Sequence, residues 1–208
     1  MKEKTFEPTL PEGYSVAFRL NAQGFKIGLV LNLVAFILLV LVAVLAYLPV
    51  FMLKSAVWDE YFNLPSPLLL LIIILIYMVL HELTHGAAYK LLTKEKLTFG
   101  ISWSCAFCGV PHIYTYRRTA LISALAPLVV FSAILLPIIA LSFLFAPGIY
   151  FTLVIVFGLH LGGASGDIYL SLLLGMKYRN PLTLINDTGP EMTVYVPETP
   201  ADQVDSSD

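Results

Sequence analysis

Four long apolar stretches constrain this chain more than any other feature of its sequence. They cover approximately residues 27–53, 65–89, 119–146 and 150–176. A helix needs about 20 residues to cross the hydrocarbon core of a bilayer, so each stretch is long enough to be a membrane span. Apolar residues make up 58% of the chain and charged residues only 12%, about half the charged share of an ordinary soluble domain. The sequence therefore predicts an all-α polytopic membrane protein with about four transmembrane helices.

The remaining sequence divides around this helical block. We expect a cytoplasmic N-terminal segment over 1–26, a four-helix membrane domain over 27–176 and a cytoplasmic C-terminal tail over 177–208. Within residues 97–116, β-branched and aromatic residues are interrupted by glycine and proline, which favours a small cytoplasmic β-hairpin. The polar, proline-containing tail is expected to be loose, apart from a short strand over 192–196.

The basic residues predict the orientation in the cell membrane. Lys and Arg near the ends of spans stay cytoplasmic far more often than not. Eleven of the twelve lie on one side of the predicted spans, and only Lys54 lies on the other. Both termini are therefore expected to be cytoplasmic, and the N-terminus is expected to be retained, because about 26 mixed residues precede the first apolar stretch. The net charge of −2 gives no basic surplus for nucleic acid, so the lipid bilayer is the expected surrounding.

The second apolar stretch carries the sequence His81-Glu82-Leu83-Thr84-His85, which fits the pattern H-E-x-x-H. Residues four apart share one face of a helix, so His81 and His85 can bind one Zn²⁺. Glu82 would lie beside the metal and take a proton from the Zn-bound water, whose pKa the ion lowers toward 7. Ionisable groups in a span cost about 2.5 to 3.5 kcal/mol each at the helix centre, which favours a metal site over chance.

Catalytic zinc usually has three protein ligands, and the fourth stretch offers His160 and Asp167. Two helical turns separate them by about 10 Å, too far for both to bind one ion unless the helix breaks. If the second and fourth spans start at the outer surface, His81 lies about 24 Å deep, Asp167 about 26 Å and His160 about 15 Å. Asp167 is the preferred third ligand. His160 is the alternative, either as ligand or as a group that supports the site from outside the ligand set.

Two further patterns accompany these residues. Gly158, Gly162 and Gly166 recur every four residues, a small-residue face that we expect to bring the second and fourth spans close together. Cys105-x-x-Cys108 resembles half of a structural zinc site, with His112 nearby, but the second half is missing. These cysteines are more simply small residues of the hairpin, which could pair with an extended substrate.

Taken together, these motifs resemble a prokaryotic membrane family described as putative zincin peptidases, over about residues 65–197. More distantly, the chain is similar to the site-2 proteases, in which an aspartate on a later span completes an H-E-x-x-H helix. The resemblance implies that His81, His85 and Asp167 are zinc ligands and that Glu82 is the base. The sequence around Asp167, Ser-Gly-Asp-Ile, departs from the usual N-P-x-x-D-G or L-D-G around the aspartate of the site-2 proteases. The residues that carry the likeness are HELTHG, CxxC, Tyr-Arg-Arg, Ala-Leu-Ala-Pro, His160, Gly166-Asp167 and Asp187-Thr-Gly.

The sequence favours a membrane-embedded zinc metallopeptidase that cleaves a peptide or membrane-protein substrate near the cytoplasmic face. One alternative is a membrane protein that binds metal without hydrolysis, for transport or sensing, and that would not need Glu82. Another is a scaffold with a purely structural zinc, in which His160 and Asp167 would both be ligands and no position would remain for water.

Overall fold

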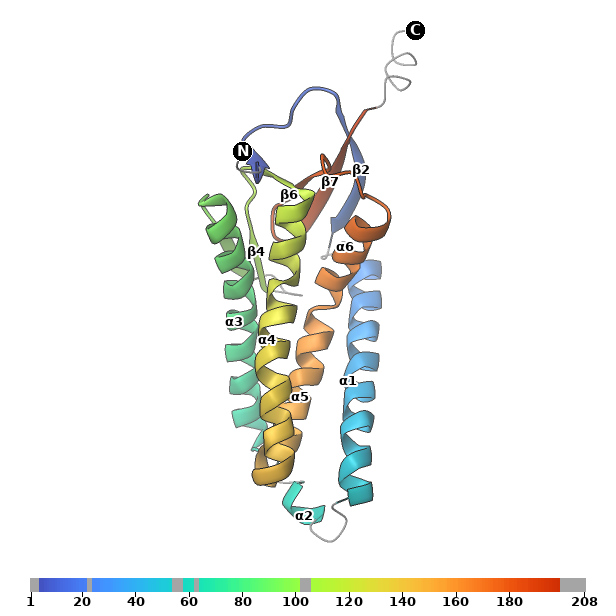
Figure 1. Cartoon of the computed structure of the whole chain (residues 1–208), viewed down its shortest axis with the longest axis vertical. Coiled ribbons are helices and arrows are strands. Elements are labelled where there is room, and N and C mark those ends of the chain that lie inside the picture. The colour runs from blue at the N-terminus through green and yellow to red at the C-terminus, as the bar shows by residue number, and fades with distance from the viewer. Residues whose placement is uncertain (1–3, 22–23, 54–57, 62–63, 102–105, 199–208) are drawn as a thin grey trace. The chain divides into compact units, whose positions relative to one another are not determined.

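The structure is a computed structural model that describes residues 4–21, 24–53, 58–61, 64–101 and 106–198 (Figure 1). It is mostly helical and also contains two small β-sheets. The helices are α1 (Phe25–Leu53), α2 (Trp58–Tyr61), α3 (Pro67–Thr93), α4 (Arg117–Phe145), α5 (Pro147–Gly163) and α6 (Ser165–Met176). The strands are β1 (Phe6–Glu7), β2 (Tyr14–Asn21), β3 (Thr98–Ile101), β4 (Ala106–Gly109), β5 (Tyr114–Tyr116), β6 (Leu184–Asp187) and β7 (Glu191–Pro197).

The chain forms two compact units. The first, which we call the sheet unit, comprises residues 1–27, 82–126 and 167–208. The second, which we call the helical unit, comprises residues 28–81 and 127–166. Helices α3 and α4 contribute residues to both units.

Three of the four predicted apolar stretches are single helices. Helices α1, α3 and α4 are each long and apolar enough to cross a membrane. The fourth stretch is instead broken at Ala164 into α5 and α6, which together also pass this test. Gly162, Gly163 and Ser165 flank the break, and glycine and serine are weak helix formers. The backbone N–H of Ala164 donates to the carbonyls of His160 and Gly162, which closes the end of α5.

The helical unit packs α5 against α1 through glycine. A Cβ atom at Gly158 would lie 2.6 Å from Leu39 Cδ1, and one at Gly162 would lie 3.0 Å from the Cβ of Ala35. Such distances show that the two backbones approach as closely as glycine permits. The expectation that this glycine face brings the second and fourth spans together is therefore wrong for Gly158 and Gly162, because the neighbour is α1. Glycine spacing predicts a close approach but not its partner.

Much of the apolar surface of these helices faces outward. Phe36 of α1 is 62% exposed, Leu69 of α3 is 50% exposed and Val129 of α4 is 62% exposed. Exposed apolar side chains in such number are rare on soluble monomers and favour contact with another apolar phase or partner.

The sheet unit contains a five-stranded antiparallel sheet with the order β1-β5-β6-β7-β2. It joins the two ends of the chain, since Ser15 of β2 pairs with Val196 of β7. The expectation of an all-α protein with one hairpin is therefore wrong for this unit. The strands β1 and β2 pair with segments more than 100 residues away, so no short-range sequence pattern indicates the sheet.

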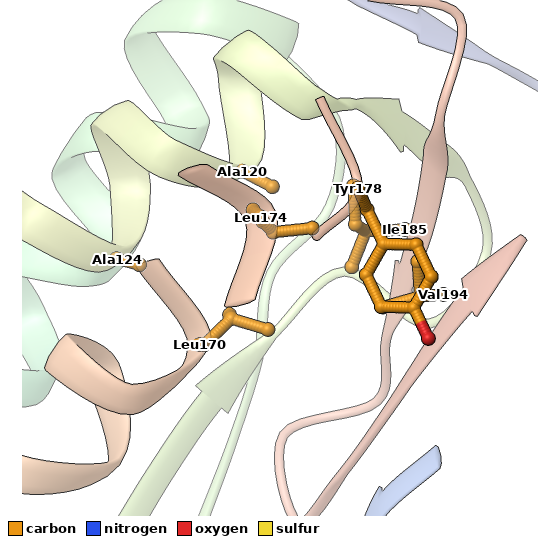
Figure 2. Packing of buried hydrophobic residues seen from close by; sticks show 7 residues of the cluster. All are labelled: Ala120, Ala124, Leu170, Leu174, Tyr178, Ile185 and Val194. Atoms are coloured by element: carbon orange, nitrogen blue, oxygen red, sulfur yellow. The ribbon is translucent and has the colours of Figure 1, made fainter. Parts of the chain in front are cut away.

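One hydrophobic cluster binds this sheet to helices within the same unit. Figure 2 shows side chains from α4 and α6 directed toward the strands β6 and β7. Leu170 and Leu174 of α6 are buried to within 1% of complete burial, as are Ile185 and Val194 of the sheet. Burying a side chain of this size contributes about 1.5 to 3 kcal/mol. The full cluster is Ala120, Ala124, Leu170, Leu174, Tyr178, Ile185 and Val194.

The smaller sheet confirms the predicted hairpin in part. β3 and β4 pair antiparallel, with Phe99 opposite Cys108, whereas Cys105 lies outside the described residues. β5, at the end of the same segment, joins the larger sheet instead. The predicted short strand over 192–196 lies within β7. The expectation that the rest of the tail is loose is wrong over 184–187, where β6 is the central strand of the larger sheet.

The glycine contact between α1 and α5 yields a stability prediction. Gly162→Ala places a methyl group against the backbone of Ala35, whose Cα and carbonyl oxygen lie 3.1 and 3.2 Å from it. Backbone cannot move aside as a flexible side chain can, so we expect a loss of about 1 to 3 kcal/mol in the free energy of unfolding. Denaturant unfolding of the purified protein measures it. The control is Gly163→Ala, where the new Cβ meets nothing within 4 Å, and equal stability of the two variants would contradict the prediction.

Candidate metal centre

Helix α3 places His81 and His85 one turn apart. Both side chains are buried, with 6% and 8% of their surface exposed. Glu82 lies between them in the sequence and is partly buried. The helix therefore presents two imidazoles on one face, with a carboxylate on the residue next to the first.

The surroundings of His85 fix which ring nitrogen can bind a metal. Its Nδ1 lies 2.8 Å from the backbone carbonyl oxygen of Ser123 in α4. A carbonyl only accepts hydrogen bonds, so Nδ1 carries a proton, and in the neutral imidazole Nε2 then keeps its lone pair. Nε2 lies 3.3 Å from Oδ2 of Asp167. This is the common arrangement of a metal-ligating histidine, in which one nitrogen donates to the protein and the other faces the ligand.

Asp167 reaches this position from the first turn of α6, directly after the break at Ala164. One possible ligand atom from each of His81, His85 and Asp167 lies within 4.8 Å of the others. The structure thus brings together the three residues that the sequence proposed as ligands. The depth comparison had placed Asp167 level with the histidines.

These three residues fit a zinc ion. With bonds of about 2.0 to 2.2 Å and tetrahedral angles, two ligand atoms of one zinc lie about 3.4 Å apart. The 3.3 Å between His85 Nε2 and Asp167 Oδ2 matches that value. Two imidazoles and one carboxylate are also a donor set found in catalytic zinc sites, which keep a fourth position open.

Glu82 has a hydrogen-bond partner in the hairpin formed by β3 and β4. Its carboxylate accepts a hydrogen bond from the backbone N–H of Cys108 in β4. Gly86 permits this approach, because a Cβ at that position would lie 2.7 Å from the ring of Phe99 and 3.2 Å from the Sγ of Cys108. Gly86 therefore serves the contact between α3 and the hairpin, which the sequence did not indicate.

His160 has other partners. The residue is completely buried, and its Nδ1 lies 2.8 Å from the hydroxyl of Tyr77 while its Nε2 lies 3.1 Å from the hydroxyl of Ser132. It is not part of the group formed by His81, His85 and Asp167.

Asp187 is a buried carboxylate near this centre, and sequence analysis assigned it no role. Its Oδ2 accepts a hydrogen bond of 2.7 Å from the hydroxyl of Tyr89, and its Oδ1 accepts one of 2.8 Å from the backbone N–H of Gly189. Tyr89 lies four residues after His85, on the same face of α3. That spacing was the available signal. The backbone carbonyl of Asp187 accepts from the N–H of Val110, next to β4, so this turn supports the strand that contacts Glu82.

The hairpin cysteine is an unfavourable metal ligand. Cys108 is buried, and burial, together with the carboxylates of Asp187 and Glu82, raises the pKa of its thiol to about 12. Zinc binds the thiolate, so this residue is held in the wrong protonation state at neutral pH. His112 is exposed, and Cys105 lies outside the described residues.

A family model described as "Putative zincin peptidase" matches residues 74–180, about half of the chain. The chain belongs to this family. The matched segment contains His81, Glu82, His85, His160 and Asp167, whereas Asp187 lies beyond it. No curated protein and no solved structure gives a significant match. Membership supports a metallopeptidase role in general and zinc as the cofactor.

Asp187 generates a prediction on pH. Burial raises its pKa from 3.8 to about 6, against the opposing hydrogen bonds from Tyr89 and Gly189. The folded state therefore binds a proton that the unfolded state releases between about pH 4 and pH 6, so stability falls as pH rises through that window. We expect the free energy of unfolding of wild type to fall by about 3 kcal/mol relative to Asp187→Asn, which does not titrate.

Thermal unfolding of both proteins at several pH values between 4 and 7 measures this difference. The comparison of two proteins cancels the titration of other groups. Parallel pH profiles would contradict a raised pKa at Asp187.

Proposed function

We propose that this protein is a membrane-embedded zinc metallopeptidase that hydrolyses a peptide bond near the cytoplasmic face. The observation that carries the proposal is the grouping of His81, His85 and Asp167, with Glu82 directly after the first ligand. Membership in the zincin peptidase family supports the same reaction class.

The residues of this chain would divide the reaction as follows. His81, His85 and Asp167 would hold zinc, which when bound supplies a Lewis acid that polarises a carbonyl and lowers the pKa of water toward 7. Glu82 would accept a proton from the attacking water and pass it to the leaving amine, so that one water and one peptide bond give one carboxylate and one amine. The N–H of Cys108 would orient the Glu82 carboxylate for this transfer.

The outward apolar side chains of the long helices support membrane insertion. Helices α1, α3 and α4 are long and apolar enough to span, and α5 with α6 would form a fourth, broken span. We propose a cell-membrane location with both termini cytoplasmic, because eleven of twelve basic residues lie on that side of the four spans. The centre on α3 lies in the turns before Lys90, which supports chemistry near the cytoplasmic face under this orientation.

Metal analysis of purified variants tests the site. We expect one zinc per chain in wild type and in Glu82→Gln, and loss of zinc in His81→Ala and Asp167→Ala, because each of the latter removes a ligand. His112→Ala is the matched control, since it removes an exposed histidine and should retain zinc. Wild type without zinc, or Asp167→Ala with full zinc, would overturn the ligand set.

Cleavage of a peptide library, followed by mass spectrometry, tests hydrolysis. Glu82→Gln keeps the shape of the side chain but cannot accept the proton, so we expect its cleavage rate to fall by about 10² to 10⁴. Equal rates would exclude Glu82 as the base. Zinc binding by wild type with no cleavage of library or membrane-anchored peptides would favour a metal-binding protein that does not hydrolyse.

Reporter fusions test the orientation. We expect a fluorescent protein fused after Asp208 to fluoresce, because it stays in the cytoplasm. An alkaline phosphatase fused after Ala146, between α4 and α5, should be active because it is exported. The opposite pattern would show that the chain is inverted.

A further inference from the structure

Four polar side chains from three helices meet inside the helical unit. The hydroxyl oxygen of Tyr77 in α3 lies 2.8 Å from Nδ1 of His81 and also 2.8 Å from Nδ1 of His160 in α5. Nε2 of His160 lies 3.1 Å from the hydroxyl of Ser132 in α4. These contacts form one hydrogen-bonded chain from His81 to Ser132.

The surroundings of this chain are apolar. The ring of Tyr77 lies against the ring of Phe131, with centroids 5.2 Å apart, and Phe131 and Phe157 each lie 5.8 Å from the ring of His160. Burying an imidazole in such a setting is costly unless its nitrogens are hydrogen-bonded. The chain satisfies both nitrogens of His160, which explains how this residue is tolerated but not what it does.

Counting the donors and acceptors in the chain gives His160 a role. The hydroxyl of Tyr77 carries one hydrogen, so it donates to one of the two histidines and accepts from the other. The chain can therefore run in either of two directions. In one direction His81 carries its proton on Nδ1 and keeps the lone pair on Nε2. In the other, Tyr77 donates to His81, and Nε2 of His81 carries the proton and cannot bind a metal.

His85 faces no such ambiguity, because its partner is the carbonyl of Ser123, which only accepts. The partner of His81 is the hydroxyl of Tyr77, which can donate or accept. The direction of that hydrogen bond depends on whether Tyr77 donates to His160 or accepts from it. If Tyr77 donates to Nδ1 of His160, then Nε2 of His160 donates to Ser132 and the proton of His81 is held on Nδ1. In this direction Tyr77 and His160 together hold the proton of His81 on Nδ1, as the carbonyl of Ser123 alone does for His85.

We propose that Tyr77 and His160 are positioning residues for His81, fixing its proton on Nδ1 and directing Nε2 toward the metal. This inference rests on the proposed function, because it takes His81 as a zinc ligand. Partners of this kind orient metal-ligating histidines, and their removal typically weakens metal affinity by about 10 to 100-fold.

Titration of the metal-free protein with Co²⁺, and competition with Zn²⁺, tests the proposal. Tyr77→Phe removes the hydroxyl and keeps the ring that packs on Phe131, and we expect the Kd to rise about 10 to 100-fold with a changed visible absorption spectrum of bound Co²⁺. Tyr150→Phe is the matched control, because Tyr150 is also buried in the helical unit and donates its hydroxyl to the carbonyl of Ala46. It should leave affinity and spectrum unchanged.

A double-mutant cycle tests whether His160 acts through Tyr77. We expect His160→Ala to weaken metal binding in wild type but to add little in the Tyr77→Phe background, since the chain is already cut. His160→Gln, whose side-chain oxygen can accept from Tyr77, should restore part of the affinity. Loss of all metal in His160→Ala, as in His81→Ala, would instead make His160 a ligand and overturn the proposal.

Imidazole ¹⁵N spectra of the zinc-loaded protein give a readout independent of activity. We expect His160 to carry its proton on Nε2, and a proton on Nδ1 would contradict the direction of the chain. The two hypotheses fail differently. Wild type without metal removes the proposed function and this inference together, whereas wild type with zinc and a Tyr77→Phe variant of equal affinity removes the inference alone.

Discussion

Helix α3 is apolar over most of its length, yet it carries a polar stripe at intervals of four residues: Tyr77, His81, His85 and Tyr89. A buried polar group without a partner costs free energy, and the penalty grows as the surroundings become more apolar. Each member of the stripe is accordingly partnered. In the helical unit, His81 bonds to Tyr77, and Tyr77 also bonds to His160. In the sheet unit, His85 contacts the Ser123 carbonyl and Asp167, and Tyr89 bonds to Asp187. Much of the remaining fold supplies these partners.

The need for partners explains two irregular features of the chain. The fourth apolar stretch breaks at Ala164, so that Asp167 begins a new helix and brings a carboxylate to His85. The tail turns back as β6 and β7, so that Asp187 is buried against Tyr89. A straight helix and a loose tail would each be simpler for these sequences in isolation. Both would leave a polar group of α3 without its hydrogen bond or ion pair.

Short-range sequence patterns predicted the elements that depend on short-range interactions. Run length located α1, α3 and α4, and spacing on one helix placed His81 beside His85. Asp167 lies far along the chain, but depth along a regular span is almost a local property, and it ranked Asp167 above His160. The larger sheet depends on pairings between the two chain ends, and no periodicity within a short strand reveals a partner so distant. Tyr77 and Tyr89 were within reach of sequence reasoning, because their spacing from the histidines is visible, yet tyrosine on an apolar helix is read as packing.

The proposed ligands and the proposed base consequently depend on different parts of the fold. His81 and His85 share one helix, so their spacing survives rearrangement elsewhere. Glu82 depends on the N–H of Cys108 in β4, and β4 is held where Gly109 meets the turn at Asp187. A Cβ on Gly109 would lie 2.5 Å from the backbone nitrogen of Gly189, which itself adopts a positive φ of 97°. That turn links β6 to β7, and β7 is paired with β2 from the other end of the chain. The orientation of the proposed base is therefore a property of the assembled sheet, whereas the proposed zinc ligands belong to α3 and the start of α6.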